Sequence, residues 1–296
     1  MKRATALALM VAAPVLWSSA GVVTRHIEHA EPLEQVFWRS FFAFAFVAGF
    51  LVFTGKNPVA AIRKAGGAGW FSGALWAVMY TAFVIALSLT TTANALVTMS
   101  ISPLLTVIVA RIVLTDPIPL RTWLASLAAM AGIAFMFASS VGGHATGMLV
   151  ALLIPIASAL NVVALRKHSS SVDLVPAVML GGALSCLVAL PLALPFSASG
   201  RDVLLLGFLG VFQLGLPCMF LVLASRALLA PEMALISLLE VVLGPLWAWL
   251  GAGERPASST LIGGAVVLAA LVVNELAALS SRTRSSRSRR TASSYR

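Results

Sequence analysis

The sequence predicts an all-α membrane protein in which ten transmembrane helices form two inverted five-helix repeats around a central cavity. Hydrophobic residues make up 60% of the 296-residue chain, and charged residues make up only 10%. The apolar residues fall into ten stretches of roughly 20 residues, the length that a helix needs to cross a hydrocarbon core about 30 Å thick. The stretches show no two-residue alternation, which favours helices over the strands of a barrel.

Short polar breaks separate the ten predicted spans. These lie near residues 4–24, 33–54, 68–89, 93–114, 119–139, 147–166, 174–195, 202–224, 231–252 and 258–279. The first five spans form a repeat at 1–142 and the last five form a repeat at 143–280. Because five is odd, the second repeat enters the membrane upside down, an arrangement typical of secondary transporters. The Ser/Arg-rich tail at 281–296 has no apolar face and is expected to be disordered.

The net charge of +10 is distributed unevenly along the chain. With the N-terminus in the cytoplasm, the cytoplasmic Lys and Arg residues are Lys2, Arg3, Lys56, Arg63, Lys64, Arg111, Arg121, Arg166, Lys167, Arg226 and the six arginines of the tail. This positive-inside bias predicts a multi-pass plasma-membrane protein, in a bacterium an inner-membrane protein, with both termini cytoplasmic. The basic balance therefore indicates orientation rather than nucleic-acid binding, although the tail could hold anionic lipid.

An internal sequence repeat supports the division into two halves. Residues 94–116 align with residues 232–254, and each segment opens on a polar residue and ends on an acid with proline close behind. A proline interrupts each helix, Pro103 in the first segment and Pro245 in the second. These prolines are predicted hinges, because proline removes a backbone hydrogen bond from a helix.

Several motifs resemble the EamA-type ten-span members of the drug/metabolite transporter superfamily. They are Leu16-Trp17-Ser18-Ser19, Pro32 followed by Arg39, Ser102-Pro103 ahead of Asp116, and the span-9 stretch from Leu238 to Arg255. The resemblance covers residues 1–279 and is most specific in span 9. Asp116 replaces a more usual Glu, and Val241 stands where many relatives have proline, which leaves Pro245 as the only source of a kink in span 9. The resemblance implies two five-helix halves around a substrate cavity, mostly exporting small organic metabolites such as amino acids.

Two charged residues lie inside predicted spans. Glu240 is near the middle of span 9, where an acid costs about 2.5–3.5 kcal/mol on insertion scales, so it should face the bundle interior or a wet cavity. It could exchange protons with substrate, or it could be a structural acid that hydrogen-bonds a neighbouring helix. Arg39 lies one turn inside span 2 and is predicted to be a gating or ion-pair residue. It could reach the interface, pair with Glu34 or Glu28, or bind a substrate carboxylate.

Further polar and aromatic residues are candidates for the cavity wall. Span 4 carries a stripe with four-residue spacing, of which Asn94 and Ser102 are expected to face the cavity. The hydroxyls of Thr98 and Thr106, on the same stripe, can instead bond carbonyls of their own helix. The remaining candidates are mid-span rings that could stack on a substrate and amides that need a partner or water: Trp17, Trp76, Tyr80, Trp247, Asn161 and Gln213. Core packing is the alternative for each ring.

The favoured function is a secondary transporter, with export as the expected direction, that alternates access around the cavity. No G-x-x-x-x-G-K-[ST] segment occurs, so energy would come from a solute gradient, an exchanged solute or protons. A lipid or lipid-linked-sugar flippase, or a passive pore, is the alternative on the same fold. The functional unit is expected to be a monomer or a homodimer.

An intramembrane enzyme is disfavoured. All four histidines lie at span ends or in loops, no H-E-x-x-H segment occurs, and the aspartates are peripheral. The spans therefore lack the residues that a buried nucleophile with its base, or a metal site, would need. Cys186 and Cys218 lie in spans without metal or disulfide spacing. No cofactor is expected.

Overall fold

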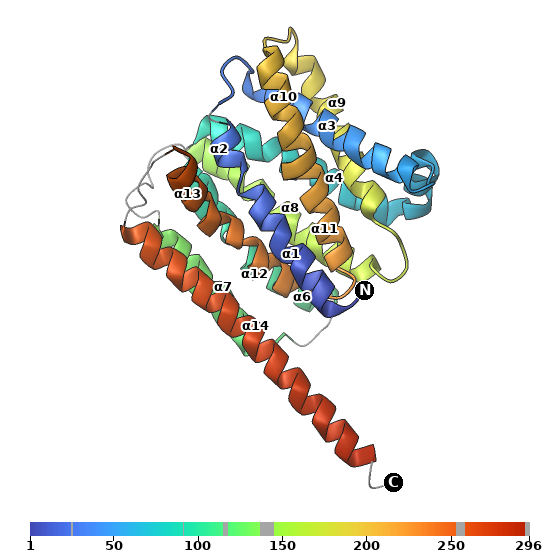
Figure 1. The fold of residues 1–296 in the computed structure, drawn as a ribbon, viewed down its shortest axis with the longest axis vertical. Coiled ribbons are helices and arrows are strands. Elements are labelled where there is room, and N and C mark those ends of the chain that lie inside the picture. Colours follow the sequence, from blue (N-terminus) through green and yellow to red (C-terminus); the bar gives the residue numbers. More distant parts are fainter. Residues whose placement is uncertain (25, 91, 115–117, 137–144, 253–257, 294–296) are drawn as a thin grey trace.

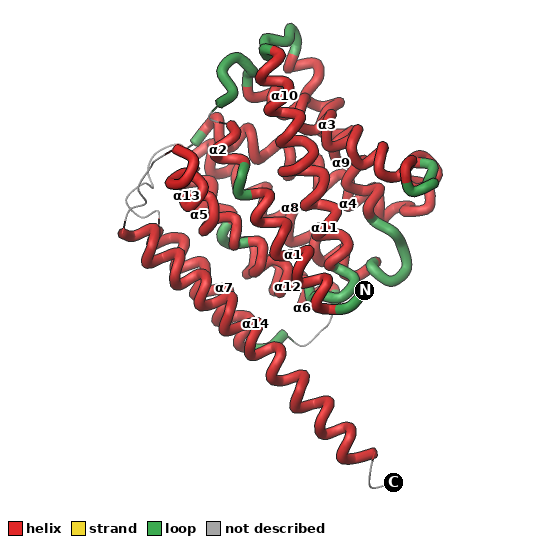
Figure 2. Tube along the Cα trace, viewed as in Figure 1, coloured by secondary structure: helices red, strands yellow, loops and turns green. Residues whose placement is uncertain are grey.

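The structure, a computed structural model, describes residues 1–24, 26–90, 92–114, 118–136, 145–252 and 258–293 (Figure 1). Side chains are described within these ranges except at 92–93, 145, 248, 251–252, 275 and 278–293. Every regular element in the described ranges is helical, as the sequence predicts (Figure 2). Asp116, Glu254 and Arg255, which the repeat and the motifs use, lie outside the described residues.

The first repeat contains five spans. They are built from α1 (Arg3–Trp17) with α2 (Ala20–Thr24), α3 (Pro32–Phe53), α4 (Pro58–Leu89), α5 (Thr92–Met99) with α6 (Ser102–Val113), and α7 (Leu120–Met136). Gly66, with φ of 56°, bends α4 just before the predicted start of span 3. Glycine suits this position because other L-residues rarely adopt a positive φ.

The second repeat contains the other five spans. They are α8 (Ala145–His168), α9 (Val175–Ala193), α10 (Gly200–Phe208) with the π-helical η1 (Leu209–Gly215) and α11 (Leu216–Ala224), α12 (Ala230–Ser237) with α13 (Leu239–Ala252), and α14 (Ser258–Ser293). Within the described residues, eight segments are long and apolar enough to cross a membrane. Two shorter apolar helices, Leu120–Met136 and Ser258–Asn274, supply spans 5 and 10.

Local signals in the sequence explain where several helices begin. Proline occupies the first turn of α3, α4, α9 and α12, where its missing N–H is not needed. The Asn57 side chain accepts from the N–H groups of Val59 and Ala60 at the start of α4. At the start of α10, Ser199 and Asp202 form a reciprocal capping box.

The packing of the helices has the symmetry of two inverted repeats. Helix α4 packs on α8 as α11 packs on α1, α4 packs on α9 as η1 packs on α3, and α6 packs on α8 as α12 packs on α1. The pairs α3 with α9, α6 with α12 and α7 with α14 join equivalent spans of the two repeats. Each contact therefore recurs with the repeats exchanged, and α7 and α14 run together along one edge of the bundle (Figure 1).

Spans 4 and 9 are interrupted at equivalent positions. The offset of 138 residues that aligns Asn94 with Glu232 also maps the bounds of α5 onto those of α12. Span 9 breaks at Leu238, whose N–H bonds to the Leu235 carbonyl in a tight turn, and α13 runs through Pro245 without interruption. The break in span 9 is therefore a backbone turn at Leu238 and does not coincide with Pro245, whose role as a hinge stays a prediction.

In span 4, by contrast, the predicted hinge residue stands at the break. Pro103 is in the first turn of α6, directly after the turn at Ser100 and Ile101. The Ser100 hydroxyl donates to the Val97 carbonyl, as the Ser237 hydroxyl in span 9 donates to the Met233 carbonyl. Serine hydroxyls that bond back to their own helix compete with its hydrogen-bond ladder and favour such bends.

The C-terminal tail differs from its prediction. Helix α14 continues to Ser293, so the backbone of the Ser/Arg-rich tail is helical where composition predicts disorder. Arginine has a high helix propensity, and adding residues to an existing helix avoids the cost of nucleation. In Figure 1, the C-terminal part of α14 projects beyond the bundle.

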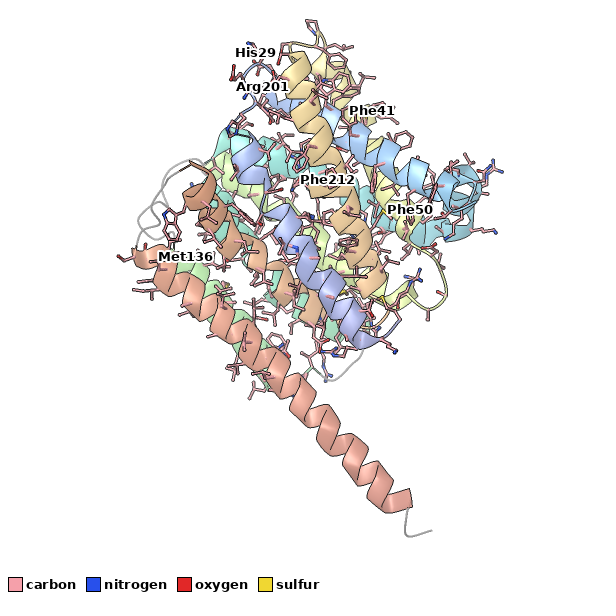
Figure 3. All side chains as sticks on the ribbon, in the orientation of Figure 1. His29, Phe41, Phe50, Met136, Arg201 and Phe212 are labelled. Atoms are coloured by element: carbon pink, nitrogen blue, oxygen red, sulfur yellow. The ribbon has the colours of Figure 1, made fainter. Side chains whose placement is uncertain are left out.

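The outer surface of the bundle is apolar, as a lipid-facing surface requires. Ile112, Leu149 and Leu204 are 72%, 67% and 77% exposed. Phe41 and Phe50, at 39% each, lie on the outer side of α3 (Figure 3). This surface and the spans establish a multi-pass membrane protein.

Candidate functional site

A cavity of about 540 Å³ lies in the middle of the bundle, between the two repeats. Its wall is mostly apolar and draws residues from every span except 5 and 7. Span 2 contributes Arg39 alone. The volume falls within the range of about 300–1,000 Å³ that is typical of small-molecule sites. The cavity is large enough for a small organic solute.

Seven of the nine residues predicted to line a cavity do line this one. They are Trp17, Trp76, Tyr80, Ser102, Asn161, Gln213 and Glu240. Arg39 and Pro245 also belong to the wall. The residues come from both repeats, so the fold brings together side chains that are far apart in the sequence.

Asn94 and Trp247 do not line the cavity, which corrects two predictions. Asn94 is fully buried, and its side-chain amide donates to the Thr90 hydroxyl at 2.8 Å. Trp247 is not among the wall residues, and its indole N–H donates to the hydroxyl of Ser18 at 2.8 Å. Trp247 therefore contacts a wall residue at the break between α1 and α2 rather than the cavity itself.

Glu240 lies in the first turn of α13 and faces the cavity. It forms no hydrogen bond or ion pair with the side chains and backbone that the structure describes. The alternative that it hydrogen-bonds a neighbouring helix therefore has no support in the geometry. Its partner in the repeat alignment is Ser102, which also lines the cavity and donates to the Ser158 hydroxyl at 3.5 Å.

Arg39, the basic residue of the cavity wall, is buried, with 3% of its surface exposed. One guanidinium nitrogen, Nη2, donates to the Gln213 carbonyl oxygen at 2.7 Å, and the guanidinium lies 5.7 Å from the centre of the Phe83 ring. A cation over an aromatic face is favourable. Within the described residues Arg39 has no acidic partner, so the predicted ion pair with Glu34 or Glu28 is absent.

The two acids considered as partners for Arg39 are used elsewhere. Both oxygens of Glu34 accept hydrogen bonds, from the Trp38 indole, from the Ser197 N–H and hydroxyl, and from the Ala198 N–H. Glu28 pairs with Arg201 at 3.3 Å. His29 and Arg201 mark the end of the bundle opposite the N-terminus (Figure 3).

Four buried polar atoms of the cavity wall have no hydrogen-bond partner among the described residues. They are Arg39 Nε, Trp76 Nε1, the Tyr80 hydroxyl and Asn161 Nδ2. Asn161 uses its other atom, Oδ1, to accept from the Ser72 hydroxyl at 2.6 Å. All four atoms can donate a hydrogen bond, and a buried donor without a partner is costly.

Sequence reasoning missed several wall residues, including Met79 and Phe83 on α4. A signal for Phe83 was present, because Trp76, Tyr80, Phe83 and Leu87 follow helical spacing and share one face. Ser158 and Thr260 carried no such signal. Small hydroxyl residues are common in membrane helices and satisfy themselves on their own backbone.

The cavity reaches one end of the bundle and is closed at the other. Thr24, Leu87 and Thr260 bring its wall to the end opposite the N-terminus. At the end where α1 begins, here named the closed end, fully buried side chains such as Leu165 and Leu228 fill the centre. Access from only one end is what an alternating-access carrier shows in one of its states.

Ion pairs join the repeats at the closed end. Arg3 of α1 donates from both terminal nitrogens to Glu232 of α12, at 2.9 and 3.2 Å. Between loops, Asp173 of the second repeat accepts from Lys56 of the first repeat at 2.8 Å and from Arg226 of its own repeat at 3.3 Å. Partial burial raises the pKa of Asp173, but the hydrogen bond and charge of Lys56 and the other donors outweigh it, so the pKa lies below its ordinary value.

Comparison with known proteins identifies the family. The profile of the EamA-like transporter family matches residues 4–138 and again residues 145–275. The chain is a member of the EamA-like transporter family. The two matches correspond to the two repeats, and membership makes the chain a membrane transporter of the drug/metabolite superfamily.

A solved structure supports the fold of this EamA-like protein. That structure, described only as the crystal structure of a protein, aligns with a TM-score of 0.79 over 93% of this chain and 98% of its own. The sequences are 18% identical, so the likeness concerns the fold alone. No curated protein shows a significant sequence match to this chain.

Proposed function

We propose that this EamA-like protein is a secondary transporter that exports small organic metabolites such as amino acids by alternating access. The central observation is a cavity between inverted repeats whose wall presents one guanidinium, Arg39, and one carboxyl group, Glu240, and neither has a counter-ion among the residues that the structure describes. A zwitterionic solute carries the charge that complements each of them. Burying both charges without such a ligand is costly, which gives the wall a reason to bind one.

The charge distribution supports an orientation for this transporter. The positive-inside bias supports a cytoplasmic position for both termini, and therefore for the closed end, of a protein in a bacterial inner membrane. The cavity then faces the outside. Because the sequence contains no nucleotide-binding loop, transport is driven by a solute gradient, an exchanged solute or protons.

The aromatic wall favours a small solute over a lipid. Trp17, Trp76, Tyr80 and Phe83 line the cavity, and such rings suit an apolar or planar part of a solute. The packed core at the closed end argues against a passive pore, which needs a continuous path.

Counterflow into liposomes tests the proposal. Purified protein is reconstituted with a high internal concentration of one amino acid, and entry of the labelled amino acid is measured for a panel of acidic, basic, aliphatic and aromatic members. Entry above that of protein-free liposomes is expected for at least one. If no member of the panel exchanges, the substrate class is wrong.

Glu240→Gln tests proton coupling. We expect an imposed pH gradient to drive uptake by the wild-type protein, and we expect this component to vanish in the variant because an amide cannot carry the proton. Counterflow without a pH gradient should persist but weaken, because the amide no longer offers a charge to the ammonium group of the substrate. Glu31→Gln makes the same change at an exposed position and serves as the control. Equal pH dependence in wild type and Glu240→Gln would exclude Glu240 as the proton carrier.

A further inference from the structure

The contact between Arg39 and Gln213 joins the two repeats deep in the bundle. Their hydrogen bond of 2.7 Å is buried and links residues 174 positions apart. Gln213 itself is 5% exposed. Neither residue has another hydrogen bond through its side chain to the part of the chain that the structure describes.

The backbone around this contact is built for close approach. A Cβ atom at Gly210 would lie 2.6 Å from both the Arg39 carbonyl oxygen and the Phe42 Cβ, so only glycine lets η1 pack this tightly on α3. Gly215, at the end of η1, meets the Phe46 ring, where a Cβ would lie at 2.8 Å. The segment that carries Gln213 is therefore seated on α3 at the level of Arg39.

The π-helical geometry of η1 changes which side chains face inward. A π-helical segment has a wider turn than an α-helix, and such segments occur often at functional sites. Within η1, Phe212 is 45% exposed on the outer surface, while Gln213 and Leu214 are buried and line the cavity. The wide turn thus brings a neutral amide to the guanidinium.

The charge of Arg39 stays uncompensated in this arrangement. Gln213 contributes an acceptor oxygen without a negative charge, and only Nη2 of the guanidinium uses it. The Nε atom of Arg39 has no hydrogen-bond partner in the described residues. A planar guanidinium with free donors matches a carboxylate, which accepts two parallel hydrogen bonds.

We propose that Arg39 and Gln213 form the carboxylate subsite of the cavity, with Gln213 as a specificity-determining residue that positions the guanidinium while leaving its charge to the substrate. The inference rests on the proposed function. A single carboxylate is favoured over a dianion because the same wall already contains an acidic group, Glu240. An acid at position 213 would act as a resident carboxylate and would compete with the substrate.

Binding to the purified protein tests the subsite separately from transport. The probe is an amino acid that exchanges in counterflow or, if none does, L-alanine and L-phenylalanine, each compared with its methyl ester and with the amine that lacks the carboxyl group. Quenching of the cavity tryptophans is the readout. We expect wild type to bind the acid at least about tenfold more tightly than the ester or amine, the loss of roughly one charge-assisted contact.

Two variants should abolish this preference. Gln213→Glu neutralises Arg39 from within, and Arg39→Gln removes the charge, so both should bring the ratio of acid to ester affinity close to one. Asn274→Asp is the matched control, because it converts another buried amide to an acid outside the cavity and should keep the wild-type ratio. If neither cavity variant folds, the wild-type ratio alone decides.

The outcomes separate this inference from the proposed function. Counterflow of an amino acid together with equal binding of acid and ester overturns the subsite and leaves the transporter intact. Absence of counterflow with a retained preference for acid overturns the substrate class of the transporter and supports the subsite. Inorganic phosphate and chloride are included as competitors. Competition by either as strong as that of the acid would show a general anion site and would overturn the carboxylate assignment.

Discussion

At the closed end of the bundle Arg3 pairs with Glu232 and Asp173 pairs with Lys56 and Arg226, whereas in the cavity wall Arg39 and Glu240 have no ionic partner in the described residues. Both regions lie between the repeats and both contain charges of each sign. The closed end satisfies its charges internally, which holds the repeats together. The cavity keeps its charges apart, so that only an added solute can satisfy them. Fixed contacts and substrate contacts are thus separated along the bundle.

The pair of Arg3 and Glu232 should give the largest effect on stability. Arg3→Glu places two acids together where 17% and 6% of the side chains are exposed, and breaking a mostly buried pair costs about 3 kcal/mol. Denaturant unfolding in mild detergent measures the loss, and Lys2→Glu makes the same change at an exposed neighbour. Adding Glu232→Arg to Arg3→Glu should recover part of the loss. An Arg3→Glu protein as stable as the Lys2→Glu protein would mean that the pair does not hold the closed end.

The fold could be predicted from the sequence because the membrane imposes it. Span length, apolar composition and an odd number of spans in each half leave few arrangements. The repeat that sets Asn94 against Glu232 also predicted that spans 4 and 9 would both be interrupted, as they are. The Leu238 turn itself was missed because it depends on backbone hydrogen bonds, whereas Pro245 gave a sequence signal without producing a break.

The cavity could be predicted less completely than the fold. Polarity inside a span identifies residues that need partners, and this found Arg39, Gln213, Asn161 and Glu240. Spacing does not fix the rotation of a helix, so Asn94 could not be distinguished from Ser102 on the same stripe. The contact of Arg39 with Gln213 involves the π-helical turn of η1. The spacing of apolar residues in the sequence does not predict a π-helical turn.

Glu34 sharpens the comparison because it shares α3 with Arg39 and is also buried, at 1% exposure. The groups that hydrogen-bond its carboxylate are all donors. Glu34→Gln turns an NH₂ group, itself a donor, towards them and should lower the free energy of unfolding by about 1–3 kcal/mol. Transport per folded molecule should be unchanged. Thermal unfolding in detergent checks the first point and counterflow the second, with Glu31→Gln as the exposed control. A large loss of transport without a loss of stability would place Glu34 with the substrate contacts instead.

Asp173 should give the smallest effect, because its side chain and those of Lys56 and Arg226 are 35%, 52% and 40% exposed. Asp173→Asn should lower stability at pH 7 by about 0.2–1 kcal/mol for each pair lost, and salt should screen the difference. Since the pKa of Asp173 is below its ordinary value of 3.8 in the folded protein, its contribution is complete above that value and is lost as the pH falls through the lowered pKa. Unfolding of wild type and variant should therefore converge in acid. A difference that widened as the pH fell would show that Asp173 is not held as an anion by Lys56 and Arg226.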